Sequence, residues 1–209
     1  GLTSCDGTVA SNTLEETERP LTLAGHPDLT MVSLAGDDAN VFTGQDSQKV
    51  VSFAGSVPAG KAWRLGDGAV YNPNGVNVAG SVEVDPGVVM KTDRGIQDRR
   101  GGFSVNGEGA LRLLGTAQRP ITVTSMRDDT VAGDSGGDGP SSTTTGTWAS
   151  GLATLNAGGS LVVRHAQVRW LVYPFISEYE PAGTIDVRDS TFSTPAPITP
   201  VAWGSRPEG

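Results

Sequence analysis

The segment from Pro120 to Gly151 carries the residues best suited to hold a cation. An alternating run over residues 121–126 predicts a β-strand, and an acidic, glycine-rich loop follows it. The loop contains four closely spaced carboxylates: Asp128, Asp129, Asp134 and Asp138. Such carboxylates repel one another unless a cation or solvent offsets their charge. We therefore predict that this loop binds one divalent cation.

Calcium is the expected ion, because it accepts carboxylate, carbonyl and water oxygens in flexible geometry. A loop that starts at Asp134 is not an EF-hand, since its twelfth position is Thr145 rather than a bidentate Glu. No His or Cys lies nearby, which disfavours a transition metal. The alternative is a solvated turn whose Asp side chains cap backbone N–H groups.

Aromatic residues form a second candidate site, between Arg169 and Pro181. The predicted ligand-binding side chains are Trp170, Tyr173 and Tyr179, with Phe175 in the same stretch. An exposed aromatic platform stacks on sugar rings through its apolar faces. The alternative is a loop folded over the molecule with these aromatic side chains buried.

Catalytic patterns are sparse, and we assign no catalytic residue. His26 and His165 are the only histidines, and no Gly-x-Ser-x-Gly motif occurs. Arg164 and Arg188 fall at equivalent positions of a repeat, with carboxylates close by in the sequence. This column fits an outward ladder of solvated charge or, alternatively, a lyase-like groove.

Composition limits the partners that the chain can bind. It has 209 residues, enough for one sizeable domain, and a net charge of -8. An acidic balance disfavours nucleic acid and anionic membrane surfaces, and no apolar run is long enough for a transmembrane helix. The single cysteine, Cys5, cannot form an intrachain disulfide. It is either an incidental thiol or the lipidated residue of a lipoprotein cleavage box, which the run from Leu2 to Cys5 resembles.

A recurring strand pattern indicates the scaffold that positions these residues. Two apolar strand residues, a corner with a small side chain and a further apolar residue recur in three segments: Val82–Val89, Leu161–Val168 and Ile185–Phe192. The last two segments are 24 residues apart, and repeats of this length indicate a solenoid. No stretch after residue 20 keeps a helical period, so we predict an all-β fold. The alternative is a β-sandwich, whose strands usually run longer than these.

The repeat makes a prediction about register. Leu161 should stack on Ile185, and Val163 on Val187, across a parallel ladder with a spacing of about 4.8 Å. All four side chains should then be buried, because one face of every strand fills the interior.

The chain divides into three predicted regions. Residues 1–20 are expected to be a flexible tether, and residues 21–60 an N-terminal β-rich cap or the first irregular turns. Residues 61–209 are expected to form a parallel β-helix, the solenoid that the repeat indicates, with the acidic loop inserted at residues 127–148.

An ordered series of motifs carries a family resemblance. Its members are Val82–Met90, Gly101–Gly107, Gly115–Ser125, Arg127–Asp129, Gly133–Gly139 and Trp148. The series, within residues 76–192, resembles the right-handed parallel β-helix regions of bacterial secreted and cell-surface proteins, which are related in architecture to pectate lyases. The chain departs from that family at Gly137, where Asn is usual, and so lacks one side-chain oxygen in the loop.

The resemblance implies a right-handed parallel β-helix, a solenoid, with the acidic loop as an insertion. It is poorly specific for function, because such helices serve many proteins. We expect a non-catalytic extracellular or cell-surface module that acts as a rigid scaffold or adhesin and contacts polysaccharide or cell-surface glycan. It would belong to a larger surface protein or assembly. The alternative is a fragment of a polysaccharide lyase or glycoside hydrolase.

Overall fold

A computed structural model describes the chain at residues 2–3, 11, 13–14, 21–24, 41–43, 46–92, 102–140, 151–171, 174–177 and 183–193. Their regular structure is almost entirely β-strand, with one short 3-10 helix, η2 (Asp46–Lys49), and the longest described loop covers residues 126–140. The expected all-β class is therefore confirmed. No helix of the described residues is long and apolar enough to cross a membrane.

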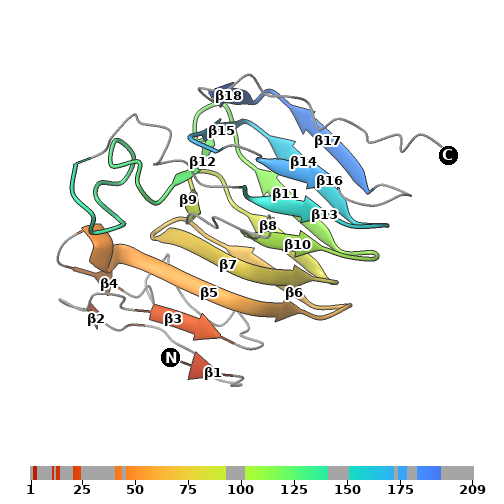
Figure 1. Ribbon diagram of the computed structural model, residues 1–209, viewed down its shortest axis with the longest axis horizontal. Helices are drawn as coiled ribbons and strands as arrows, with labels where there is room; N and C mark the ends of the chain where they lie inside the picture. Colours follow the sequence, from red (N-terminus) through yellow and green to blue (C-terminus); the bar gives the residue numbers. More distant parts are fainter. Residues whose placement is uncertain are drawn as a thin grey trace, which may run out of the picture.

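Two parallel sheets make up the body of the molecule (Figure 1). The larger sheet has eleven strands: β1 (Leu2–Thr3), β3 (Leu21–Ala24), β5 (Val50–Val57), β7 (Val70–Val78), β9 (Val89–Thr92), β10 (Phe103–Val105), β12 (Ile121–Ser125), β13 (Ala153–Leu155), β15 (Ala166–Arg169), β16 (Phe175–Ser177) and β18 (Thr191–Ser193). The smaller sheet has five: β6 (Ala62–Leu65), β8 (Ser81–Val84), β11 (Ala110–Leu114), β14 (Ser160–Arg164) and β17 (Thr184–Arg188). Strands β2 (Thr13–Leu14) and β4 (Val41–Phe42) pair separately.

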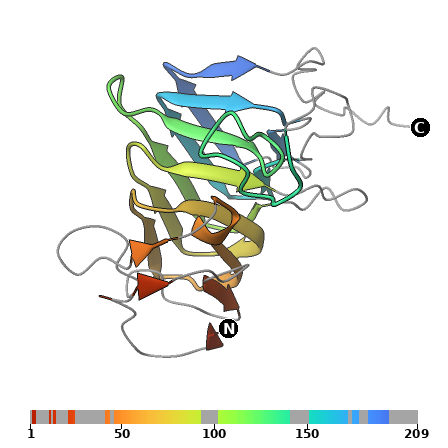
Figure 2. The same ribbon diagram turned by 90° about the vertical axis from the view of Figure 1, so that its left-hand side faces the viewer.

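Each strand of the larger sheet after β7 pairs along one of two paths, β9-β12-β15-β18 or β10-β13-β16, and both paths start at β7. The smaller sheet follows the order of the chain without exception: β6, β8, β11, β14 and β17 are successive neighbours. Every strand pair among the described residues is parallel, unlike the antiparallel pairs of a β-sandwich. Figure 2, turned by 90°, shows the strands stacked as successive layers.

Alternating side chains explain why the strands stack in this register. In β8 the two valines face inward and are fully buried, whereas the serine and the glutamate are partly exposed. The ladder places Val82 beside Leu111 and Leu111 beside Leu161, so one apolar column runs through the interior. Each fully buried side chain of this kind stabilises the fold by about 1.5–3 kcal/mol.

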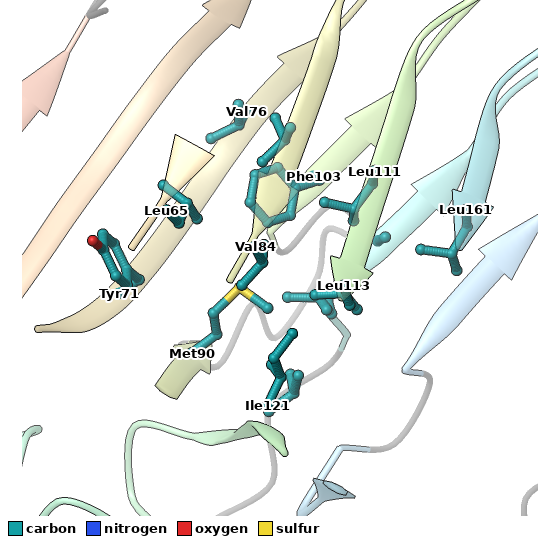
Figure 3. Packing of buried hydrophobic residues seen from close by; sticks show 14 of the residues in the cluster. Leu65, Tyr71, Val76, Val84, Met90, Phe103, Leu111, Leu113, Ile121 and Leu161 are labelled. Atoms are coloured by element: carbon teal, nitrogen blue, oxygen red, sulfur yellow. The ribbon is translucent and has the colours of Figure 1, made fainter. Parts of the chain in front are cut away.

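The core is one continuous cluster that includes side chains from both sheets (Figure 3). Phe53 lies at its aromatic end, with ring centroids 6.1 Å from Trp63, 6.2 Å from Tyr71 and 6.0 Å from Phe103. The phenol of Tyr71 donates a hydrogen bond of 2.8 Å to the Gly66 carbonyl, which satisfies its buried polar atom. Aliphatic residues fill the rest of the interior.

The predicted register is confirmed, but the predicted burial of the last strand is wrong. Leu161 pairs with Ile185 and Val163 with Val187 in a parallel ladder. The first member of each pair is buried, whereas Ile185 is 44% exposed and Val187 37% exposed. The reason is the position of the strand. β17 is the terminal strand of its sheet, so no described strand pairs with its outer edge and stacks its side chains on Ile185 and Val187.

Several strands near the N-terminal end of the described chain belong to the larger sheet. Strands β1, β3 and β5 lie side by side there and extend the same parallel ladder, whereas β2 and β4 form a separate pair. The cap and the tether stay predictions. Cys5 and His26 lie outside the described residues, as do residues 141–148 at the end of the predicted insertion.

Candidate functional site

The acidic loop leaves the end of β12 and lies on the side of the molecule where η2 is found (Figure 1). Strand β12 pairs with β9 on one side and with β15 on the other. These two neighbours each contribute a basic side chain to the loop: Lys91 from β9 and Arg169 from β15. The base of the loop therefore lies between two cations that come from distant parts of the sequence.

Asp128 is the buried anchor of the loop. Its side chain is fully buried, and one carboxylate oxygen accepts a hydrogen bond from Thr124 Oγ1 at 2.6 Å and forms an ion pair with Arg169 Nε at 2.9 Å. Arg169 Nη2 also donates a hydrogen bond of 3.4 Å to the other carboxylate oxygen. That oxygen accepts from the backbone N–H of Thr130 at 3.2 Å and from the Thr130 hydroxyl at 2.6 Å. Charge-assisted bonds of this kind are roughly twice as strong as neutral ones. Asp128 thus fixes the first turn after β12.

Lys91 is the second anchor, and it was not predicted from the sequence. Its side chain is fully buried, and its ammonium donates to the Asp128 carbonyl at 3.0 Å, the Gly133 carbonyl at 2.8 Å and Ser135 Oγ at 2.9 Å. An ammonium has three N–H donors, so each of them has an acceptor. Lys91 thereby ties both ends of the segment 128–135 to β9.

Opposing effects act on the pKa of Lys91. Burial lowers this pKa below its ordinary value, because the charged form loses its hydration. The negative charges of Asp128, Asp129, Asp134 and Asp46 act in the opposite direction and favour the ammonium. Three acceptors around one nitrogen also suit the charged form, so we assign Lys91 as an ammonium at neutral pH.

Three of the four predicted metal ligands lie together, and one does not. Carboxylate oxygens of Asp129, Asp134 and Asp138 lie within 4.8 Å of one another. Asp128 is instead engaged with Arg169 and the two threonines described above. Hard carboxylate ligands of this kind suit calcium, so the outer three residues are the ones that fit such an ion.

The chain's own groups already occupy part of this outer cluster. Asp134 accepts backbone N–H bonds from Asp138 at 3.1 Å and from Gly139 at 3.0 Å, one on each carboxylate oxygen. Asp138 forms an ion pair of 3.3 Å with Arg127. These contacts correspond to the capped turn that the sequence allows as an alternative to calcium.

Residue 133 lies so close to the Asp46 side chain that only glycine fits there. It has a φ of +68°, and a Cβ atom at this position would lie 1.7 Å from Asp46 Oδ2. The carboxylate of η2 thus lies directly against the loop. Asp46 itself pairs with Lys49 at 3.3 Å, so its charge is offset within the same short helix.

The aromatic candidates are described only in part. Trp170 is partly buried at the end of β15 and has a φ of +55°, a backbone conformation that is unusual for a bulky residue. The backbone N–H of Trp170 donates a hydrogen bond of 3.4 Å to the Ser193 carbonyl. Tyr173 and Tyr179 lie outside the described residues, so a shared aromatic platform stays a prediction.

The arginine column forms a ladder of ion pairs. Arg164 and Arg188 are register partners on β14 and β17, as predicted. Both bind Asp186: Arg164 through an ion pair and a 3.0 Å bond to its carbonyl, Arg188 through Nε at 3.0 Å. The two guanidinium groups lower the pKa of the Asp186 carboxyl. Both guanidinium groups are thus engaged with the same aspartate, as in a ladder of paired charges.

Comparisons of the chain with protein-family models, with curated proteins and with solved structures gave no match. Its function is therefore inferred from the geometry of the strands and of the loop.

Proposed function

We propose that the chain is a right-handed parallel β-helix that serves as a non-catalytic scaffold or adhesin module of a bacterial extracellular or cell-surface protein. The observation that carries this proposal is the in-register ladder of the smaller sheet, from β6 to β17. Each connection returns the chain to the next position on the same sheet, which is how a solenoid grows.

A continuous apolar interior supports the scaffold role. Close-packed interiors resist deformation, and here the packed column runs along the direction in which the strands stack. The charged groups near the loop and on β14 and β17 are engaged with one another, which favours a structural role over a catalytic one. Our proposal therefore assigns binding, rather than chemistry, to the surface.

Glycan contact at Trp170 is the second part of the proposal. Residues in sparsely populated backbone conformations cluster at functional sites, and Trp170 is one of them. An indole face stacks on the apolar side of a sugar ring, while the indole N–H donates to hydroxyl groups. We include Tyr173 and Tyr179 in the same proposed surface.

The test is a glycan array probed with the full chain, followed by incubation of the bound glycans with the protein. We expect binding without products, and reduced binding by Trp170→Ala but not by Thr184→Ala, a substitution at an exposed position of the other sheet. Unsaturated products or new reducing ends would show that the enzyme alternative is correct. An experimental structure with left-handed or open connections would overturn the solenoid itself.

A further inference from the structure

Lys91 places a positive charge against the acidic loop for which the sequence predicts a bound cation. Two backbone carbonyls and a hydroxyl of the acidic loop point at one nitrogen atom, at distances of 2.8–3.0 Å. These are N–H···O distances, longer than the roughly 2.3–2.6 Å of calcium–oxygen bonds. The loop is thus closed around a positive charge that belongs to the chain.

The surrounding charges indicate why a cation is needed at this point. Four carboxylates interact electrostatically with the ammonium: Asp128, Asp129, Asp134 and Asp46. Three basic side chains offset part of the charge of this region, namely Arg169 at Asp128, Arg127 at Asp138 and Lys49 at Asp46. Among the described residues, Lys91 brings the cations near the loop to four, against five carboxylates, so the chain itself offsets most of the negative charge there.

We infer that the ammonium of Lys91 is the cation that orders the acidic loop, and that the wild-type loop closes without a dissolved metal ion. Removal of the side chain would leave a polar cavity, lined by the same carbonyls, that accepts an ammonium-type monovalent cation. This inference concerns the fold of the loop and is independent of the proposed glycan contact.

The experiment compares three variants of the full chain by thermal melting and by amide hydrogen exchange of residues 127–139. Lys91→Met keeps the unbranched apolar stem, one atom shorter, and removes the ammonium with its charge. Lys91→Ala makes room for n-propylammonium, which supplies the missing atoms. Lys61→Met is the control, because Lys61 is exposed and far from the loop in sequence.

We expect Lys91→Met to speed exchange of the loop amides by about tenfold or more, because it removes three charge-assisted hydrogen bonds. Lys61→Met should leave the exchange unchanged. n-Propylammonium should restore protection in Lys91→Ala, whereas n-propanol at the same concentration should not. Calcium should not raise the wild-type melting temperature above that in choline chloride of equal ionic strength.

Two results would overturn the inference. One is a Lys91→Met protein with wild-type loop exchange. The other is a wild-type protein whose melting temperature and loop protection rise with calcium but not with choline, which would support the calcium site predicted from the sequence. Should both Lys91 variants fail to fold, Ser135→Ala removes a single acceptor, and unchanged loop exchange in that variant would also count against Lys91 as the ordering cation.

Discussion

Substitution of Asp128 by Asn should destabilise the protein far more than the same change at Asp138. Asp128 is fully buried and accepts four hydrogen bonds, including one from the guanidinium of Arg169. Removal of one partner of a buried ion pair costs about 3–5 kcal/mol. Arg169 keeps 32% of its side chain exposed and can be partly rehydrated, so we expect a loss of about 3 kcal/mol in the free energy of unfolding.

The matched control comes from the same loop. The Asp138–Arg127 pair has side chains that are 39% and 43% exposed, and exposed pairs contribute about 0–1 kcal/mol. Asp138→Asn should therefore cost less than about 1 kcal/mol. Urea denaturation measures both values, provided that the slope with denaturant is the same in each variant.

A double-mutant cycle separates the ion pair from the other contacts of Asp128. Arg169→Met removes the guanidinium but keeps much of the apolar stem. We expect the double variant to be more stable than the sum of the single losses predicts, with a coupling energy of about 1–3 kcal/mol. A coupling energy near zero, or an Asp128→Asn loss below about 1 kcal/mol, would refute the assignment of Asp128 as the buried anchor.

Three further predictions test the stack of strands. Leu161→Ala should cost about 2–5 kcal/mol, and Ile185→Ala at the exposed end of the same column clearly less; equal losses in urea denaturation would contradict the terminal position of β17. Gly102→Ala should abolish cooperative thermal unfolding at the wild-type temperature, because the added Cβ would lie 1.9 Å from the Leu152 carbonyl oxygen. Gly107→Ala is the control: this residue also has a positive φ but faces open space, so the substitution should be mildly destabilising. Burial raises the pKa of Tyr71 above its ordinary value of 10.0, so its contribution to stability should be complete below pH 10 and fall as the pH rises further, since only the unfolded phenol ionises there. Tyr71→Phe should remove this alkaline slope, and an unchanged slope in alkaline urea titrations would exclude Tyr71 as its source.

The strand ladder could be predicted from the sequence because its signal is local and repeated. The pattern of Leu161–Val168 recurs 24 residues later, and each apolar position of the first segment marks an inward side chain. The exposure of Ile185 and Val187 could not be predicted from this pattern. Their sequence is that of any interior strand, and their exposure depends on which strand comes next in the stack.

The acidic loop shows a different limit, because its ordering groups are not in the loop. The carboxylates lie close together in the sequence, and their mutual repulsion predicts that a positive charge is needed. The charges that meet this need come from β9 and β15, which become neighbours of β12 only when the strands stack. The sequence did contain one signal for this contact: Lys91 follows directly on the apolar run Val88–Met90. A lysine that is buried beside such a run requires hydrogen-bonding partners from elsewhere in the chain.

Stacked parallel strands make such an internal cation an effective alternative to a metal ion. In each layer, the residue at the end of one strand lies beside the corresponding residue of the next, so a lysine on β9 is held beside the end of β12 by the ladder. Its ammonium therefore reaches the loop carbonyls with little further loss of backbone freedom, and no ion has to be drawn from solution. A metal-bound loop would gain stability in proportion to the logarithm of the ion concentration, whereas a lysine-bound loop would be equally ordered at any calcium level. For the extracellular module that we propose, this difference predicts a surface loop whose shape stays constant when the calcium concentration varies. The comparison of calcium with choline chloride measures that constancy directly.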